Sequence, residues 1–488
     1  MVIDISAVSS AIPEETVLSG LPTVRRVTAD EVAAAMAASG RSLVVLDDDP
    51  TGTQSVADVP VLTAWGVDDI RWGFQQGSGV FYILTNTRSL GPLDMAARNR
   101  EVVASLVEAA KSEKTDFVVA SRSDSTLRGH FPLETDVISD ALVANGRPPV
   151  DGTLVVPAYI DAGRVTVASV HWMRVPEGLL PVGLSEFAQD ATFGYRSSDL
   201  RDYVAEKTAG RWAAADVVSI TLPLLREGGP EAVADVLQGL RGGQPAVADA
   251  VNDDDLRLLA LGVMSAEARG STLLYRVGPS YVRARAGLVA RPPLSPAEIG
   301  AIRSRADHPG GHGLIVVGSH VPRTTRQLDA LLSTGAVERV DLDVTEILDP
   351  HLRREAIARA TAAVSSSLRH SDVALCTSRQ LVRGDSPDAS LGIARSISSA
   401  LVEVTRAAGE LRSPGWVVAK GGITSSDIAT EALGIRRAWA RGTLLPGIVS
   451  LWEPVVGTVP GAPYIVFAGN VGDDRALVDA VSHLNASA

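Results

Sequence analysis

The chain has 488 residues, 45% of them apolar and 4% aromatic, and a formal net charge of −12. This length predicts two large domains or three small ones, and a core of Ala, Val, Leu and Ile suits parallel strands covered by helices. An acidic chain without a basic tract is a poor candidate for binding nucleic acid or an anionic membrane. Cys376 is the single cysteine, which excludes an intrachain disulfide and a cysteine-based zinc site.

The first residues of the sequence carry no basic segment followed by an apolar stretch. No window holds about 18 consecutive apolar residues, the length that a membrane-spanning helix needs. We therefore expect neither a signal peptide nor a transmembrane helix, and we expect a cytoplasmic protein. A homodimer is compatible with the sequence, which does not fix the oligomeric state.

Short apolar runs alternate with helical patterns in the first part of the chain. The runs that predict buried strands are residues 43–46, 80–84, 117–120, 154–156, 217–222 and 273–275. Helical spacing of apolar residues predicts helices at 92–111 and 132–143. The segment 174–212 lacks a clean period. The regular order of strand, loop and helix predicts right-handed βαβ units and a mostly parallel sheet.

Stretches rich in Pro and Gly at 290–293 and 308–313 divide the chain and flank one short helical segment. We therefore predict a first domain of residues 1–285, a linker region of residues 286–312 and a second domain of residues 313–488. The strands predicted in the second domain are residues 314–317, 337–342, 373–376, 416–419, 436–442, 447–452 and 464–467, with helices at 350–368, 389–408 and 472–485. The predicted fold class is α/β, with two domains that each hold a mostly parallel sheet flanked by helices.

An acidic turn, Asp47 to Gln54, follows the first predicted strand. Ligands of open α/β sheets bind just past the C-terminal ends of the strands, where this turn lies. Adjacent carboxylates raise one another's pKa values unless a cation or hydrogen-bond donors offset them. Such a turn can hold sugar hydroxyls, act as a general base or bind Mg²⁺. The alternative is a solvated turn with an Asp cap.

Two further clusters follow strands of the first domain. Residues 121–130 are rich in hydroxyl groups and include Asp124 and Arg128, and residues 161–166 include Gly163 and Arg164. Arginine binds carboxylate or phosphate through two parallel hydrogen bonds. Carboxylates and arginines together suit a small hydroxylated carboxylic acid as ligand. The alternative for the first cluster is a helix N-cap region with surface arginines.

Glycine turns follow three strands of the second domain, at 317–319, 419–427 and 467–472. Backbone N–H groups at such turns can hold a phosphate, so three of them in one domain predict a nucleotide phosphate site. The alternative is that these glycines simply end strands. The sequence has no GxxxxGK[ST] motif, no GxGxxG after the first strand of either domain and no HExxH motif. The sequence therefore lacks the dinucleotide-binding motif that a nicotinamide-dependent oxidoreductase needs.

These motifs together resemble those of the four-carbon acid sugar kinase family, in a subgroup with the form Asp-Pro-Thr-Gly-Thr-Gln, and the resemblance covers nearly the whole chain. The landmarks are residues 48–52, 124–129, 157–158, 163–167, 280–283, 317–319, 421–425 and 469–472. The resemblance implies a substrate-binding N-terminal domain, a nucleotide-binding C-terminal domain and an active site in the cleft between them. It also implies ATP-dependent phosphorylation of an acid such as threonate, erythronate or 3-oxo-tetronate.

The resemblance implies functional roles for the residues of this sequence that match the family's motifs. ATP contacts are implied at Ser319, Gly421, Gly422, Ile423, Thr424 and Gly469. The substrate pocket is expected to include Asp49, Thr51, Arg128, Gly163 and Arg164. Asp48 is the favoured catalytic base and Asp124 the second candidate.

Mg²⁺ would accompany ATP in this interpretation, and the sequence does not identify its protein ligands. The partners expected are a small acid sugar and ATP. Two alternatives stay open, a kinase for a different hydroxylated acid or sugar and a non-catalytic acid-sugar sensor of the same fold.

Overall fold

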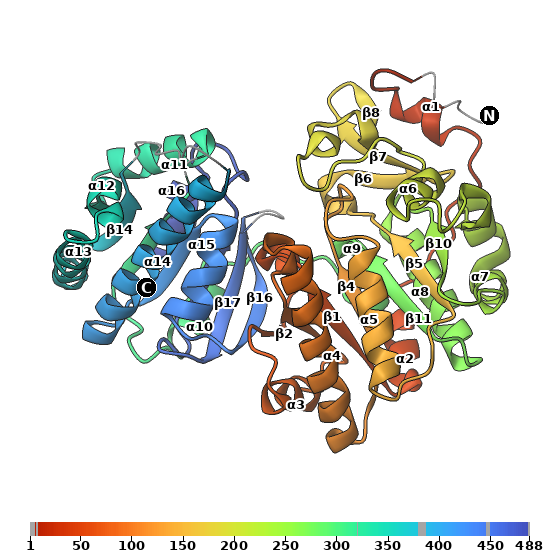
Figure 1. Ribbon diagram of the computed structural model, residues 1–488, viewed down its shortest axis with the longest axis horizontal. Helices are drawn as coiled ribbons and strands as arrows, with labels where there is room; N and C mark the ends of the chain where they lie inside the picture. Colours follow the sequence, from red (N-terminus) through yellow and green to blue (C-terminus); the bar gives the residue numbers. More distant parts are fainter. Residues whose placement is uncertain (1–4, 6–7, 320, 379–386, 446–448, 487–488) are drawn as a thin grey trace. The chain divides into compact units, whose positions relative to one another are not determined.

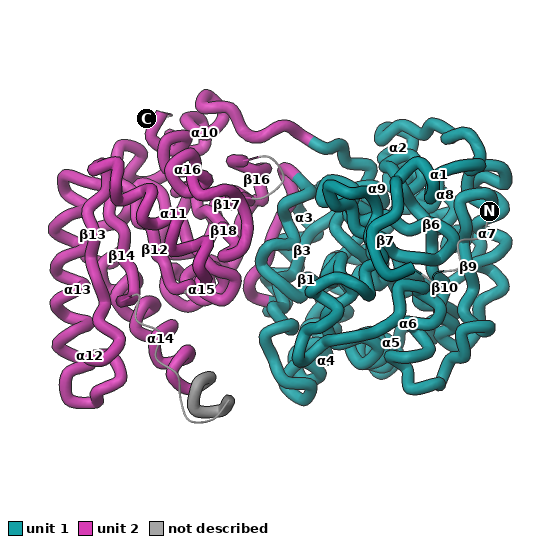
Figure 2. The backbone as a smooth tube through the Cα atoms, turned by 90° about the horizontal axis from the view of Figure 1, so that it is seen from above, with its two compact units in different colours: residues 1–56, 65–290 teal, residues 57–64, 291–488 magenta. Residues whose placement is uncertain are grey.

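A computed structural model describes residue 5 and residues 8–319, 321–378, 387–445 and 449–486. The chain forms two compact units (Figure 2). Unit 1 holds residues 1–56 and 65–290, and unit 2 holds residues 57–64 and 291–488. The short segment 57–64 thus packs with the second unit, although the sequence analysis assigned it to the first domain.

The sheet of unit 1 is parallel throughout. Its strand order is β3-β1-β4-β11-β5-β10-β9. The strands are β1 Arg41–Asp47, β3 Val80–Leu84, β4 Asp116–Arg122, β5 Gly152–Val156, β9 Val218–Ile220, β10 Gln244–Ala248 and β11 Leu273–Val277. Apolar side chains of β1 such as Leu43 and Leu46 are fully buried, because helices cover both faces of the sheet. The mostly parallel sheet predicted from the sequence is confirmed.

Helices pack on both sides of this sheet (Figures 1 and 2). The helices of unit 1 are α1 Glu14–Leu18, α2 Ala29–Ser39, α3 Val67–Gln75, α4 Pro92–Glu113, α5 Leu133–Ala144, α6 Leu200–Lys207, α7 Gly229–Gln238, α8 Asp253–Ala268 and α9 Pro279–Arg285. Figure 2 shows α4 and α5 on one side of β1 and β3, and α2, α8 and α9 on the other. The helices predicted at 92–111 and 132–143 correspond to α4 and α5.

A small antiparallel sheet, β6 Arg164–Val167, β7 Val170–Val175 and β8 Gly178–Pro181, belongs to unit 1. Its first hairpin turns at Ala168 and Ser169, whose φ angles of 51° and 66° are left-handed. Their N–H groups each donate to the buried carboxylate of Asp249 at 2.8 Å, which stabilises this turn. This sheet was not predicted from the sequence, and Arg164 was expected in a loop cluster, whereas it begins the strand β6.

The sheet of unit 2 begins with five parallel strands and ends with antiparallel ones. The order is β13-β14-β12-β15-β18-β17-β16-β2. The strands are β2 Val59–Leu62, β12 Gly313–Val317, β13 Val337–Leu342, β14 Asp372–Thr377, β15 Trp416–Lys420, β16 Arg437–Leu445, β17 Val449–Val456 and β18 Tyr464–Phe467. Pairing of β2 with β16 explains why residues 57–64 join this unit.

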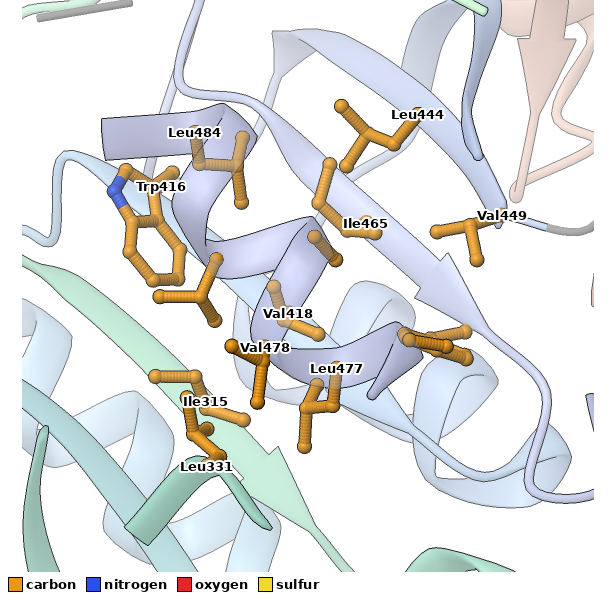
Figure 3. Packing of buried hydrophobic residues seen from close by; sticks show 14 of the residues in the cluster. Ile315, Leu331, Trp416, Val418, Leu444, Val449, Ile465, Leu477, Val478 and Leu484 are labelled. Carbon is orange, nitrogen blue, oxygen red and sulfur yellow. The ribbon is translucent and has the colours of Figure 1, made fainter. Parts of the chain in front are cut away.

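The helices of unit 2 are α10 Pro296–Arg303, α11 Pro322–Ser333, α12 Val344–Leu348, α13 Arg353–Ser367, α14 Pro387–Leu411, α15 Gly422–Asp427 and α16 Ala476–Asn485. Side chains of α16 such as Leu477 and Leu484 are fully buried against the sheet with Ile315, Trp416 and Ile465 (Figure 3). At about 25 cal/mol for each Å² of apolar surface removed from water, this cluster is a main source of the unit's stability.

No helix in the described part of the chain is long and apolar enough to span a membrane. In each unit the parallel strands end at one common edge, since parallel strands run in the same direction. The acidic turn lies at this edge in unit 1, and the glycine turns lie at it in unit 2. These two edges hold the residues that the sequence singles out.

Candidate functional site

Asp47 ends β1 beside Arg122, the last residue of β4, because the two strands pair in that register. The guanidinium of Arg122 binds the Asp47 carboxylate and also donates to the carbonyl oxygen of Asp49 at 2.8 Å. Burial raises the pKa of Asp47 to about 7, against the opposing charge of Arg122. A Cβ at Gly52 would overlap both Asp47 and Arg122, so glycine is required where the turn crosses this ion pair.

Asp48 is buried and held by Arg88 through two hydrogen bonds. Nε of Arg88 lies 3.0 Å from Oδ2 of Asp48, and Nη2 lies 2.6 Å from Oδ1. Arg88 also reaches Oδ2 of Asp49, at 3.3 Å. The burial of Arg88 opposes its charge, yet Asp48 and Asp49 hold its pKa well above the usual value. Two carboxylates therefore share one guanidinium.

Asp49 caps the 3₁₀ turn Pro50–Ser55. Its Oδ1 accepts from the Thr51 N–H at 2.9 Å and from the Thr51 hydroxyl at 2.5 Å. Burial alone would raise the pKa of Asp49, but the charges of Arg88 and Arg122 lower it. The carboxylate is about a quarter exposed, at 24%, so it can still accept a hydrogen bond from a ligand.

Asp124 is the acidic residue of the second cluster. It accepts from Nε of Arg128 at 2.7 Å and from the hydroxyl of Thr126. Burial opposes ionisation, but the charges of Arg88 and Arg128 hold the pKa of Asp124 well below its usual range. Arg128 lies over the ring of Phe187, 4.9 Å from its centre. Both of these groups are therefore charged and held in place before a ligand arrives.

Gly129 brings the second cluster against the first. Its φ of +122° is unfavourable for other residues, and a Cβ there would lie 3.3 Å from Oδ2 of Asp48. Glu134, buried at the start of α5, accepts from the Thr87 hydroxyl at 3.2 Å. Burial and the nearby charge of Asp48 raise the pKa of Glu134 to about 7. The clusters that follow β1 and β4 thus form one site.

Arg164 lies beside these groups without a carboxylate partner. Its Nη1 donates to the carbonyl oxygen of Ala162 at 2.8 Å, and its buried Nε has no hydrogen-bond partner. Within the described part of the chain, no carboxylate lies within 4.0 Å of its guanidinium, whereas Arg88, Arg122 and Arg128 all have one. Burial lowers the pKa of Arg164, while the charge of Asp124 raises it.

Gly163 precedes Arg164 and adopts a left-handed φ of +72°. A Cβ at this position would come 2.9 Å from Cβ of Arg174 on β7. The glycine therefore lets the chain turn tightly from β5 into β6, and it determines where the Arg164 side chain begins.

The structure brings together the predicted residues Asp48, Asp49, Thr51, Asp124, Arg128, Gly163 and Arg164. Sequence reasoning did not single out Arg88, Arg122, Glu134 or Arg276, which hold or contact this group. Arg88 ends the stretch Thr85 to Arg88 directly after the second predicted strand, and this position was the signal that could have found it. Glu134 had no such signal, because it lies inside a helix whose neighbours are known only from the fold.

In unit 2, Ser319 lies between two of the glycine turns. A Cβ at Gly469 would come 2.9 Å from Oγ of Ser319, and a Cβ at Gly421 would come 3.3 Å from its Cβ. The hydroxyl of Thr424 would lie 3.0 Å from the added Cβ at Gly421. Gly421 has a φ of +127°, which favours glycine. The turns after β12, β15 and β18 therefore meet in one small cradle that a single methyl group would fill.

Gly422 and Ile423 begin α15 at the edge of this cradle. The Ile423 side chain is exposed, at 60%, and Thr424 and Ser425 are buried. The hydroxyl of Ser425 donates to carbonyl oxygens of Ala419 and Gly421 at 2.7 Å, which fixes the turn. All six residues expected to contact ATP thus lie around one point of unit 2.

The described residues contain no group of three or more His, Cys, Asp or Glu side chains that could hold a metal ion. The carboxylates of the acidic turn are bound to Arg88 and Arg122, so they are not arranged as a metal-ligand set. Unit 1 offers instead an anion-binding guanidinium beside carboxylates that accept hydroxyl groups. Unit 2 offers glycine turns and hydroxyls, which suit phosphate.

Two family models match the sequence. A sugar-binding N-terminal domain matches residues 43–285, and a nucleotide-binding C-terminal domain matches residues 314–477. These matches cover the acidic turn in unit 1 and the glycine turns in unit 2.

Curated relatives and solved structures agree with these matches. The chain is 27% identical to a D-threonate kinase of Salmonella typhimurium over 417 residues, 83% of this chain and 88% of that protein. It is also 27% identical to a D-erythronate kinase of Heliobacterium modesticaldum over 292 residues, 59% of this chain and 58% of that protein. Solved structures of a Salmonella typhimurium and a Haemophilus influenzae protein have TM-scores of 0.62 and 0.58. Each is 18% identical and covers 90% of this chain and 98% of its own, a likeness that shows the fold.

Proposed function

The chain belongs to the four-carbon acid sugar kinase family, and we propose that it is an ATP-dependent kinase that phosphorylates a hydroxyl group of a four-carbon acid sugar. Unit 1 holds the acid sugar and unit 2 holds ATP. The names of the two curated relatives support threonate and erythronate as the first substrates to consider.

The observation that carries this proposal is the Arg164 guanidinium. It has no carboxylate within 4.0 Å among the described residues, and its Nε is buried without a partner. Arg276 also has no carboxylate at this distance among them, but it lies over the Phe131 ring and donates to the carbonyl oxygens of Leu127 and Arg128. A buried donor without a partner costs free energy, which a ligand carboxylate would recover. Arg164 therefore anchors the carboxylate of the acid sugar. Arg128, already bound to Asp124, assists it.

The hydroxyl groups of the sugar meet acceptors rather than donors. Arginines hold the carboxylates of Asp48, Asp49 and Asp124, and each oxygen has two acceptor positions of which the protein uses only some. Thr51 and Gly163 shape the same wall. A small acid with several hydroxyls matches this arrangement, in which Arg164 has no carboxylate partner among the described residues and the neighbouring carboxylates are fixed by other arginines.

Asp48 is the proposed general base. Phosphoryl transfer forms a bond from the substrate hydroxyl oxygen to the γ-phosphorus and breaks the bond to the β,γ-bridging oxygen, and the hydroxyl proton goes to a base. Arg88 fixes the orientation of the Asp48 carboxylate through both of its oxygens. Asp124 is the second candidate, and its low pKa makes it the weaker base.

The cradle of unit 2 fits the phosphates of ATP. Ser319 and Thr424 present hydroxyls, and the backbone approaches them closely at Gly421 and Gly469, where a Cβ would lie 3.0 Å from Oγ1 of Thr424 and 2.9 Å from Oγ of Ser319. Gly422 and Ile423 complete this wall. Since the described residues offer no metal-ligand set, Mg²⁺ would be held mainly by the ATP phosphates, where it neutralises their charge.

An ADP-release assay with Mg²⁺ and ATP tests the function. We expect turnover with at least one member of a panel of threonate, erythronate and their oxo forms. Arg164→Met should raise KM for the acid about 10- to 100-fold, the value of a lost charge-assisted hydrogen-bond pair, and leave KM for ATP within about twofold. Arg147→Met, at the opposite edge of the sheet, is the matched control and should change neither constant.

Failure of the whole panel while ATP still binds would favour a different hydroxylated substrate or a non-catalytic sensor. An Arg164→Met enzyme with unchanged KM for the acid would contradict the role of Arg164 but not the kinase activity.

A further inference from the structure

The turn Ala468–Gly472 after β18 has four consecutive carbonyl oxygens bound by side chains. Lys420 donates to the oxygen of Ala468 at 2.6 Å, and Thr324 donates to that of Gly469 at 2.9 Å. Arg323 donates to the oxygen of Asn470 at 2.9 Å, and Gln327 to that of Val471 at 3.0 Å. Three of these donors lie on α11, and Lys420 ends β15. The carbonyl side of the turn is thus fixed by four side chains from two elements.

The N–H side of the same turn must then point the other way. In a trans peptide the N–H of one residue is antiparallel to the carbonyl of the residue before it. The cis peptide bond recorded in the described residues is Phe131–Pro132, so the peptides of this turn are trans. The N–H groups of residues 469–472 therefore point away from Lys420 and α11. No described residue accepts a backbone hydrogen bond from them.

Gly469, whose N–H is the first of this series, lies beside the cradle described above. A Cβ at Gly469 would lie 2.9 Å from Oγ of Ser319 and 3.6 Å from Oγ1 of Thr324. Successive N–H groups that converge without protein acceptors form an anion-binding concavity. A phosphate in the cradle would supply the acceptors that the turn lacks.

Lys420 has no other evident partner for its charge. It is fully buried, its Nζ lies 3.8 Å from the centre of the Phe467 ring, and no carboxylate in the described ranges lies within 4.0 Å of it. Burial, with a smaller contribution from Arg323, lowers the pKa of Lys420 to about 7. Burying a lysine without an ion pair costs folding free energy. We therefore infer that the hydrogen bond from Lys420 to Ala468 has a role beyond stability.

We propose that Lys420 and Thr324 are positioning residues that hold the carbonyls of Ala468 and Gly469 inward, so that the N–H groups of residues 469–472 bind a phosphate group of ATP. This inference rests on the proposed ATP site in unit 2. Lys420 and Thr324 then contact the turn and not the substrate, and the backbone of residues 469–472 contacts the phosphate.

Calorimetric titration of the full chain with Mg²⁺-ATP, without acid sugar, tests the inference. Thr324→Val should weaken ATP binding about 3- to 10-fold, the usual value of one hydrogen bond. Thr324→Ser keeps the hydroxyl and should restore binding to within about twofold of the parent. Lys420→Met keeps the length and burial of the side chain and should weaken binding about 10-fold or more, since it removes both a donor and a charge.

Thr458→Val is the matched control. The hydroxyl of Thr458 donates to the carbonyl oxygen of Leu433 at 3.1 Å in the same unit but outside this turn. It should leave ATP affinity unchanged. If Thr458→Val and Thr324→Val weaken ATP binding equally, the effect is a general loss of stability and the inference is wrong.

Amide hydrogen exchange gives an independent readout. In the parent and in Thr324→Ser, ATP should slow exchange of the segment 469–472, and in Thr324→Val this protection should shrink. Parent-like ATP binding and protection in both Thr324→Val and Lys420→Met would overturn the positioning role alone. Absence of ATP binding by the parent would overturn the proposed function, and the positioning role with it.

Discussion

Carboxylates and guanidinium groups face one another at the strand ends of unit 1. The strand ends of unit 2 carry glycines and hydroxyl groups instead. In unit 1, Arg88 and Arg122 hold the three carboxylates that begin the acidic turn. In unit 2, Gly421 and Gly469 let the backbone approach Ser319 more closely than a residue with a Cβ could. The first site selects a ligand by the arrangement of side-chain charge, and the second by the shape and hydrogen bonds of the backbone.

This difference has an energetic consequence. Breaking a buried ion pair leaves a charge without a partner and destabilises the fold strongly. Filling an open cradle with a methyl group moves a hydroxyl and displaces a ligand, but it leaves the fold largely intact. Substitutions in unit 1 should therefore affect stability and function together, whereas substitutions in unit 2 should separate them.

The largest expected effect is that of Gly52→Ala in unit 1. The added Cβ overlaps the buried pair of Asp47 and Arg122, so we expect the free energy of unfolding to fall by about 3–5 kcal/mol. Urea unfolding followed by tryptophan fluorescence measures it. Gly91→Ala is the control, because nothing lies within 4 Å of a Cβ there. A loss of less than about 1 kcal/mol for Gly52→Ala would show that the pair tolerates displacement.

Asp48→Asn should lower kcat about 100-fold or more, because the amide neither accepts a proton nor pairs fully with Arg88. Steady-state ADP release at saturating ATP and acid measures kcat. Asp255→Asn is matched to it, since Asp255 is buried and held by Arg226 through two hydrogen bonds of 2.8 and 2.9 Å. If kcat of Asp48→Asn stays within about threefold of the parent, Asp48 is not the base.

His171 should contribute a pH dependence to the stability of unit 1. Its ring is fully buried between the Thr166 hydroxyl and the Ser125 carbonyl oxygen, and burial lowers its pKa from 6.5 to about 4. The unfolded chain therefore binds a proton between pH 6.5 and pH 4 that the folded chain does not. Stability falls as the pH is lowered through this window, by about 2 kcal/mol between pH 7 and pH 5.

Urea unfolding of His171→Gln at pH 7 and pH 5, compared with the parent, measures this contribution. The variant should lose less stability than the parent on acidification by about that amount. His308→Gln, at an exposed position, should follow the parent. Equal acid sensitivity of His171→Gln and the parent would place the responsible groups elsewhere.

The smallest of these effects is expected for Gly469→Ala in unit 2. Its Cβ would lie 2.9 Å from Oγ of Ser319, a hydroxyl that can rotate, so unfolding should change by less than about 1 kcal/mol. ATP affinity measured by calorimetry should fall about 10-fold, because the methyl group occupies the cradle. Gly409→Ala, with open space around it, is the control for both measurements. A large loss of stability without a loss of affinity would reverse the comparison between the units.

Local patterns predicted the elements of both units. The apolar runs at 43–46 and 416–419 became the buried strands β1 and β15, because strands covered on both faces must be apolar throughout. The glycine turn at 421–422 was also predictable, since it follows such a strand directly. The small sheet β6-β7-β8 escaped prediction, because three short strands that pair only with one another leave a weak pattern in the sequence.

The order of residue types along the chain was enough to predict a carboxylate-arginine site in the first domain and a glycine site in the second. It could not determine that Arg88 holds Asp48, that Glu134 lies near both, or that Arg164 begins a strand without a carboxylate partner. Nor could it place residues 57–64 with unit 2. Hydrophobic periodicity is a pattern among residues close together in the sequence. Ion pairs and strand pairing join residues that lie tens to hundreds of positions apart. Which charges meet, and which cations are left without a carboxylate partner, therefore follow from the fold and not from the local pattern.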